Sequence, residues 1–129
     1  ISTVKKVHIA DACLYAALLL CVCLITLQSG SSPLSRSMPQ TDSSVFIYVA
    51  RTLLNGGTMY VDCFDHKGPF LYVLNVVGQL INPRWGICFL DFVFLSWGII
   101  LAYKGARLAF SKPVSFLGAI LAFLYLGKR

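Results

Sequence analysis

Charged side chains gather in one short stretch of this apolar chain, YVDCFDHKGPF at residues 60–70. Asp62 and Asp65 lie three residues apart, and Lys67 stands just before a predicted helix. A lysine beside a helix N-terminus attracts phosphate, and a nearby carboxylate can hold a divalent cation, Mg²⁺ or Mn²⁺, that bridges phosphate oxygens. The same residues are typical of a polar turn with a local ion pair. The stretch therefore predicts a phosphate-binding loop or, alternatively, a turn without specific chemistry.

Two more aspartates are candidates for chemistry. Asp42 stands at the start of a helix predicted over residues 43–54, where it can act as the N-cap, as a general base, or as both. Asp91 lies inside a predicted membrane span, where an acid is a functional candidate by default. Arg84 precedes Asp91 by seven residues on the same helical face, so a paired or snorkelling carboxylate is the simpler interpretation. A zinc site is not predicted, because His66 has no second ligand histidine beside it.

The composition indicates a membrane protein, which decides where these residues would act. Hydrophobic residues make up 57% of the 129 positions and charged residues 12%, which is too little polar surface for a soluble domain of this size. The net charge of +6 comes from basic residues scattered beside apolar runs. Such scattering is typical of membrane topology and headgroup contact, so we expect no nucleic-acid partner. The five cysteines suggest neither a disulfide framework nor a metal site.

The predicted fold is all-α, with helices of two lengths. Residues 9–27 and about 85–103 are long enough to cross a hydrocarbon core of about 30 Å, and residues 113–126 begin a third span. The helices predicted over 43–54 and 69–81 are too short to span, so we expect them to lie in the membrane interface. A secretory signal peptide is the alternative interpretation of the first apolar segment.

The basic residues next to the two spans predict an orientation. These residues are Lys5, Lys6, Lys104, Arg107 and Lys112. The positive-inside rule places both groups in the cytoplasm, which leaves residues 28–84 as a long outer loop. The expected location is therefore the plasma (cytoplasmic) membrane, as a multi-pass protein with a cytoplasmic N-terminus.

The segment TDSSVFIYVARTLLNGGTMYVDCFDHKGPFLYVLNVVGQLI (41–81) resembles the first outer loop of the bacterial GT-C membrane glycosyltransferases. It is similar, more narrowly, to the family of protein mannosyltransferases and aminoarabinose–lipid A transferases. The residues that carry the resemblance are Asp42, Tyr48, Leu53, Leu54, Gly56 or Gly57, Tyr60, Asp62, Asp65, Lys67, Gly68, Pro69, Asn75 and Gly78. Gly68 departs from the pattern, because many members have proline there, and Ser43 stands where a second acid often follows the first.

The resemblance implies that a sugar is transferred from a polyprenyl-phosphate donor to an acceptor glycan, lipid or protein at the outer face of the membrane. It implies that Asp42 is the catalytic base, and that Asp65 and Lys67 line the donor-phosphate site, with a divalent metal at Asp65. It also implies that the chain is the N-terminal part of a longer polytopic enzyme and is inactive alone. The other predicted substrate-binding residues are Arg51, Tyr60 and Asp62.

Two non-enzymatic functions remain open. The chain could be a small membrane protein, such as a lipid-sugar flippase-like or accessory subunit, or a hydrophobic scaffold whose loop charges have no specific task. A small subunit would need a further span and a true C-terminus, and it would leave the acidic loop unexplained.

Overall fold

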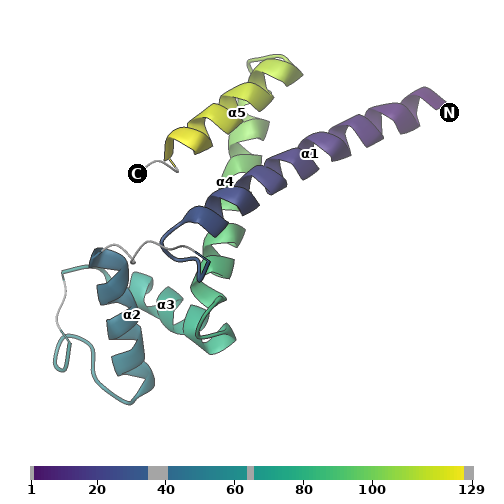
Figure 1. The fold of residues 1–129 in the computed structure, drawn as a ribbon. Coiled ribbons are helices and arrows are strands. Elements are labelled where there is room, and N and C mark those ends of the chain that lie inside the picture. Colours follow the sequence, from purple (N-terminus) through teal and green to yellow (C-terminus); the bar gives the residue numbers. More distant parts are fainter. Residues whose placement is uncertain (1, 35–40, 64–65, 127–129) are drawn as a thin grey trace. The chain divides into compact units, whose positions relative to one another are not determined.

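The computed structural model is helical throughout its regular structure, apart from an isolated bridge between Met59 and Cys63. It describes all residues except 1, 35–40, 64–65 and 127–129, and it leaves undescribed the side chains of 2–10, 41–42 and 126. The helices shown in Figure 1 are α1 (Ser2–Gln28), α2 (Thr41–Leu54), α3 (Pro69–Ile81), α4 (Gly86–Ala106) and α5 (Lys112–Leu126). Every predicted helical segment is therefore a helix.

The helix boundaries follow from local breakers. α1 begins seven residues before the predicted start, because its first two turns contain neither glycine nor proline. Pro69 opens α3 at its first position, where its missing N–H costs nothing. Gly56 ends the turn after α2 with a positive φ of 86°, which glycine adopts without strain.

The chain divides into two compact units, one of residues 1–26 and 92–129 and the other of residues 27–91. In the first unit, α1, α4 and α5 share one apolar cluster. Its buried members are Leu18, Val22, Ile99, Tyr103, Ala119 and Phe123. A Cβ added at Gly98 would lie 3.3 Å from the ring of Phe123, so α5 packs tightly against this part of α4.

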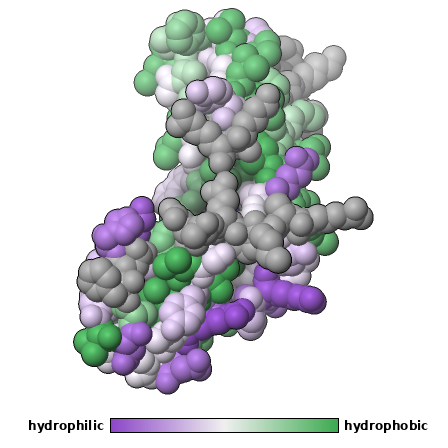
Figure 2. Space-filling model, turned by 60° about the vertical axis from the view of Figure 1, so that its left-hand side comes forward, coloured by the Kyte–Doolittle hydropathy of each residue, from purple (hydrophilic) through white to green (hydrophobic). Residues whose placement is uncertain are grey.

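Most apolar side chains of this first unit are nevertheless exposed. Leu20, Trp97 and Leu121 are 61%, 65% and 60% exposed, and hydrophobic residues cover broad areas of the surface in Figure 2. The segments Asp11–Gln28 and Gly86–Ala106 are long and apolar enough to cross a membrane, and only 17% and 28% of them are buried. The core helix of a soluble protein would be buried on most sides. α5 is apolar but shorter.

The second unit, residues 27–91, is built around the pair α2 and α3. Val49, Cys63 and Tyr72 form its buried cluster, and the rings of Phe46 and Tyr72 meet edge to face at 6.0 Å. One cross-helix hydrogen bond fixes the register, because the buried Gln79 side chain donates to the Ile47 carbonyl at 3.1 Å.

A tight corner joins α3 to α4 within the second unit. The Asn82 amide donates to the Gly78 carbonyl at 3.1 Å and ends α3, while the Asn82 carbonyl accepts from Gly86 at 2.9 Å. The Asn82 side-chain oxygen also accepts from the backbone N–H groups of Arg84 and Trp85, each at 2.9 Å, in the manner of an N-cap. The corner needs two glycines, since a Cβ on Gly86 would overlap the Gly78 carbonyl oxygen.

Candidate functional site

The loop of residues 58–68 holds several of the residues predicted to bind substrate. The Asp62 carboxylate accepts a hydrogen bond from the Thr58 backbone N–H at 2.7 Å. The Tyr60 hydroxyl donates to the Lys67 carbonyl at 2.9 Å, and Tyr60 itself has a left-handed φ of 64°. The side chains of Asp62 and Tyr60 therefore brace the loop, which is the turn role that the sequence offered as the alternative.

The remaining predicted residues are only partly described. Asp65, the predicted metal ligand, lies outside the described residues. Asp42 is the second residue of α2, but its side chain lies outside the described part. Lys67 is half-buried. Within the described chain no group of three or more histidine, cysteine or acidic residues gathers.

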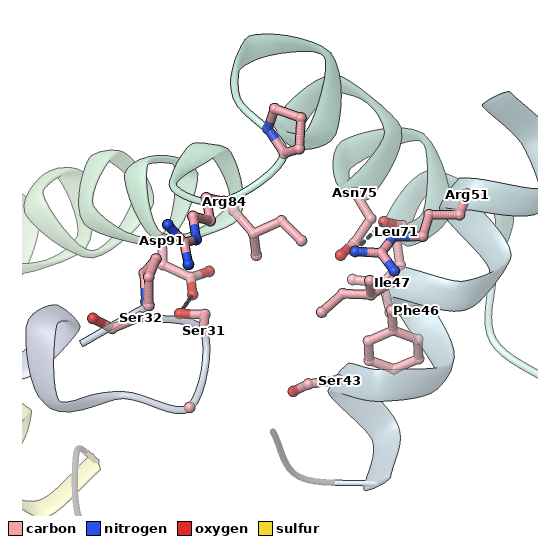
Figure 3. Close-up of a pocket in the computed structure, with 14 residues that line it drawn as sticks. Ser31, Ser32, Ser43, Phe46, Ile47, Arg51, Leu71, Asn75, Arg84 and Asp91 are labelled. Carbon is pink, nitrogen blue, oxygen red and sulfur yellow. Dashed lines mark hydrogen bonds between the residues drawn. The ribbon is translucent and has the colours of Figure 1, made fainter. Parts of the chain in front are cut away.

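A cleft of about 480 Å³ lies elsewhere in the second unit, between α2, α3, the corner and first two turns of α4, and the 30–33 turn. Figure 3 shows Arg84 beside Asp91 on one wall and Arg51 beside Asn75 on the opposite wall. The other polar residues that line it are Ser31, Ser32 and Ser43. Among the predicted substrate-binding residues, Arg51 lines the cleft, whereas Tyr60, Asp62 and Lys67 do not.

Asp91 is held on its wall by a serine turn. The Ser31 hydroxyl donates to the Asp91 carboxylate at 2.5 Å, and Ser29 and Ser31 share a hydrogen bond of 2.7 Å. The sequence predicted a paired or snorkelling carboxylate; among the described side chains Asp91 forms no ion pair with Arg84, and its partner is Ser31. The reason is geometric: the turn after α1 brings a hydroxyl closer to the half-buried carboxylate than the exposed Arg84 guanidinium reaches.

The two arginines determine what the cleft can bind. A guanidinium presents a planar set of donors that matches two oxygens of a phosphate. With Asp91 ionised, Arg51 and Arg84 leave the cleft with a formal charge of +1 (two positive charges and one negative). Asn75 donates its amide to the Leu71 carbonyl at 2.9 Å, which fixes the side chain at the cleft wall. The arrangement suits a singly charged anion with neighbouring hydroxyl groups.

Comparisons with protein-family models, with curated proteins and with solved structures find no match to this chain. The resemblance to GT-C glycosyltransferases therefore rests on the motif residues of segment 41–81 alone.

Sequence reasoning missed Ser31 and the place of Asn75 and Arg84 in the cleft. The sequence did indicate that Arg84 and Asp91 lie near one another, because a spacing of seven residues places two side chains on one face of a continued helix. Ser31 carried no comparable signal, since it lies 60 residues from its partner in a serine-rich loop.

Proposed function

We propose that this chain is part of a membrane glycosyltransferase that uses a polyprenyl-phosphate-linked sugar, and that the cleft of residues 27–91 binds the donor phosphate. The observation that carries the proposal is the cleft itself, where Arg51 and Arg84 stand on opposite walls. The motif resemblance of segment 41–81 supports the reaction class.

A lipid-linked donor requires a binding site that it can reach from within the membrane. Such a donor arrives in the plane of the bilayer, with its phosphate at headgroup level. The exposed apolar surfaces of α1 and α4 support insertion of the first unit into a bilayer. In this proposal the second unit lies at the outer face, where its polar cleft meets the donor phosphate.

The chemistry divides between the arginines and Asp42. The acceptor hydroxyl oxygen forms a bond to the anomeric carbon, and the bond from that carbon to the phosphate oxygen breaks. The bonding electrons leave with the phosphate, whose charge Arg51 and Arg84 stabilise. The hydroxyl proton passes to the Asp42 carboxylate, which acts as the general base.

Asp91 has a positioning task in this scheme. Its carboxylate orients the Ser31 hydroxyl at the cleft wall through the 2.5 Å hydrogen bond. A divalent cation at Asp65 stays a prediction from the resemblance. Asp62, the described carboxylate of the same loop, already accepts a hydrogen bond from the Thr58 backbone N–H. The proposed steps therefore use the side chains of Arg51 and Arg84, and no metal ion, to stabilise the phosphate.

The test measures binding of polyprenyl phosphate to the intact protein, with the uncharged polyprenol as the matched ligand. Arg51→Gln and Arg84→Gln should each weaken polyprenyl-phosphate binding by about ten-fold or more, because each removes hydrogen bonds to a charged group. Polyprenol binding should not change. Lys6→Gln, which removes one positive charge from α1, serves as the control. Loss of binding in Lys67→Gln, with Arg51→Gln and Arg84→Gln unaffected, would move the phosphate to the 58–68 loop.

Sugar transfer by the intact protein tests Asp42 separately. Asp42→Asn should abolish transfer while polyprenyl-phosphate binding persists. Continued transfer in that variant would remove Asp42 from the mechanism. Binding without transfer by the unmodified protein would instead favour the accessory or flippase-like function.

A further inference from the structure

A second pocket, of about 280 Å³, lies within the first unit and shares no residue with the cleft. Its lining residues are Asp11, Tyr15, Tyr103, Lys104, Arg107 and Lys112. Three cations and one carboxylate give the pocket a formal charge of +2. A pocket this basic, in a chain with so few charges, requires an explanation beyond solubility.

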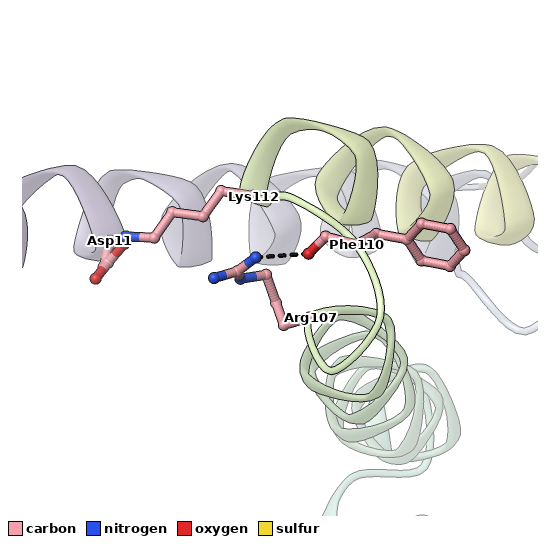
Figure 4. Close-up of polar contacts among 4 residues, drawn as sticks. All are labelled: Asp11, Arg107, Phe110 and Lys112. Atoms are coloured by element: carbon pink, nitrogen blue, oxygen red, sulfur yellow. Dashed lines mark hydrogen bonds and ion pairs between the residues drawn. The ribbon is translucent and has the colours of Figure 1, made fainter.

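Two polar contacts shape the pocket. Lys112, the first residue of α5, forms an ion pair of 2.6 Å with Asp11 of α1. The Arg107 guanidinium donates to the Phe110 carbonyl at 2.7 Å, which holds the turn between α4 and α5 (Figure 4). A guanidinium has five N–H donors, so Arg107 keeps donors for a ligand.

The pocket combines this charge with an aromatic wall. The rings of Tyr15 and Tyr103 meet edge to face at 5.7 Å, and Tyr103 is buried. Lys104 is exposed and forms no ion pair with any described side chain. A phosphate can therefore meet Lys104 and Arg107 while less polar groups of the same ligand contact the tyrosines.

The position of the pocket along the helices indicates the source of that phosphate. Asp11 lies near the start of the apolar segment of residues 9–27, which follows Lys5, Lys6 and His8, and Lys104 lies in the last turn of α4. The pocket therefore stands where two apolar segments end, which is the level of lipid headgroups around a spanning helix. Basic pockets between membrane helices are typical binding sites for anionic headgroups.

We propose that this pocket binds the phosphate of an anionic lipid headgroup, with Arg107 and Lys104 as the principal contacts. The inference rests on the membrane insertion contained in the proposed function, and it does not depend on sugar transfer. Asp11 opposes the binding: its carboxylate neutralises Lys112 and repels the headgroup.

Native mass spectrometry of the full chain in detergent tests this proposal, with phosphatidylglycerol as the probe and phosphatidylcholine as the neutral comparison. We expect one retained phosphatidylglycerol per chain. Lys104→Gln and Arg107→Gln should each weaken its binding about five-fold. Arg107→Lys should retain most of the binding because it keeps the charge, and Asp11→Asn should strengthen it. Arg36→Gln, which removes one charge from the 28–41 segment, is the matched control.

Several outcomes would overturn the proposal. Equal retention of phosphatidylcholine would show that charge does not select the lipid. If soluble glycerol 3-phosphate binds as tightly as phosphatidylglycerol, the pocket is a site for a free phosphate ligand and not for a lipid. Arg107→Gln can disturb the α4–α5 turn, so circular dichroism checks its helix content. Lys104→Gln leaves that turn intact, and unchanged lipid retention in it would exclude the site. Loss of phosphatidylglycerol retention in Arg51→Gln or Arg84→Gln, with Lys104→Gln unchanged, would assign the lipid to the cleft instead.

Discussion

Replacing Gly86 with alanine should destabilise the second unit by about 1–2 kcal/mol. An added Cβ would overlap the Gly78 carbonyl oxygen and lie 2.6 Å from its carbonyl carbon. Both atoms belong to the backbone, so the corner between α3 and α4 must open. Forced repacking of this kind costs typically about 1–3 kcal/mol, and a rigid backbone obstacle favours the upper part of that range. The gain in helix propensity, about 1 kcal/mol, offsets part of the cost.

A control in the same helix isolates the steric effect. Gly105 of α4 has no atom within 4 Å of an added Cβ, so Gly105→Ala should be neutral or stabilise by up to about 1 kcal/mol. Thermal unfolding of both variants in one detergent supplies the comparison, with an expected fall of about 5 °C or more for Gly86→Ala alone. Equal melting temperatures for the two variants would refute the close approach of α3 and α4. Polyprenyl-phosphate binding should fall with Gly86→Ala, because Arg84 and Asp91 flank the corner.

Three further predictions concern single polar contacts. Asn82→Ala should cost about 1 kcal/mol in the free energy of unfolding through loss of the cap, and Asn82→Asp should restore most of it; no difference between them would argue against the cap. A double-mutant cycle of Ser31→Ala and Asp91→Asn in chemical unfolding should give a coupling of about 1–2 kcal/mol, and additive effects would disprove the contact. Asp62→Ala should speed proteolysis within the 58–68 loop, whereas unchanged cleavage would mean that its bond to the Thr58 amide does not hold the loop.

The helices were predictable because the residues next to each helix end determine where it begins and ends. Pro69 and Asn82 mark the ends of α3 at the residues that the breakers indicate. The same is true of the turn around Asp62, whose carboxylate accepts a hydrogen bond from the Thr58 backbone N–H. Residue type and short-range spacing were sufficient in both places.

The cleft could not be predicted in the same way, since it depends on contacts between distant segments. Ser31 meets Asp91 across 60 positions of sequence, and Gln79 meets Ile47 across 32. A single amino-acid sequence does not indicate, beyond residue type, which distant residues are in contact. Arg51 was among the predicted substrate-binding residues, and the packing of α2 on α3 is what turns it toward the cleft.

The corner at Asn82 has a consequence for how the second unit responds to a ligand. Four hydrogen bonds converge on this one residue and tie the last turn of α3 to the first turn of α4. Opening the corner must break them together, so the amide hydrogens of Arg84, Trp85 and Gly86 should exchange with solvent as a single cooperative group. A phosphate held by the Arg84 side chain would then slow the exchange of all three amides at once, including those of Trp85 and Gly86, which do not line the cleft.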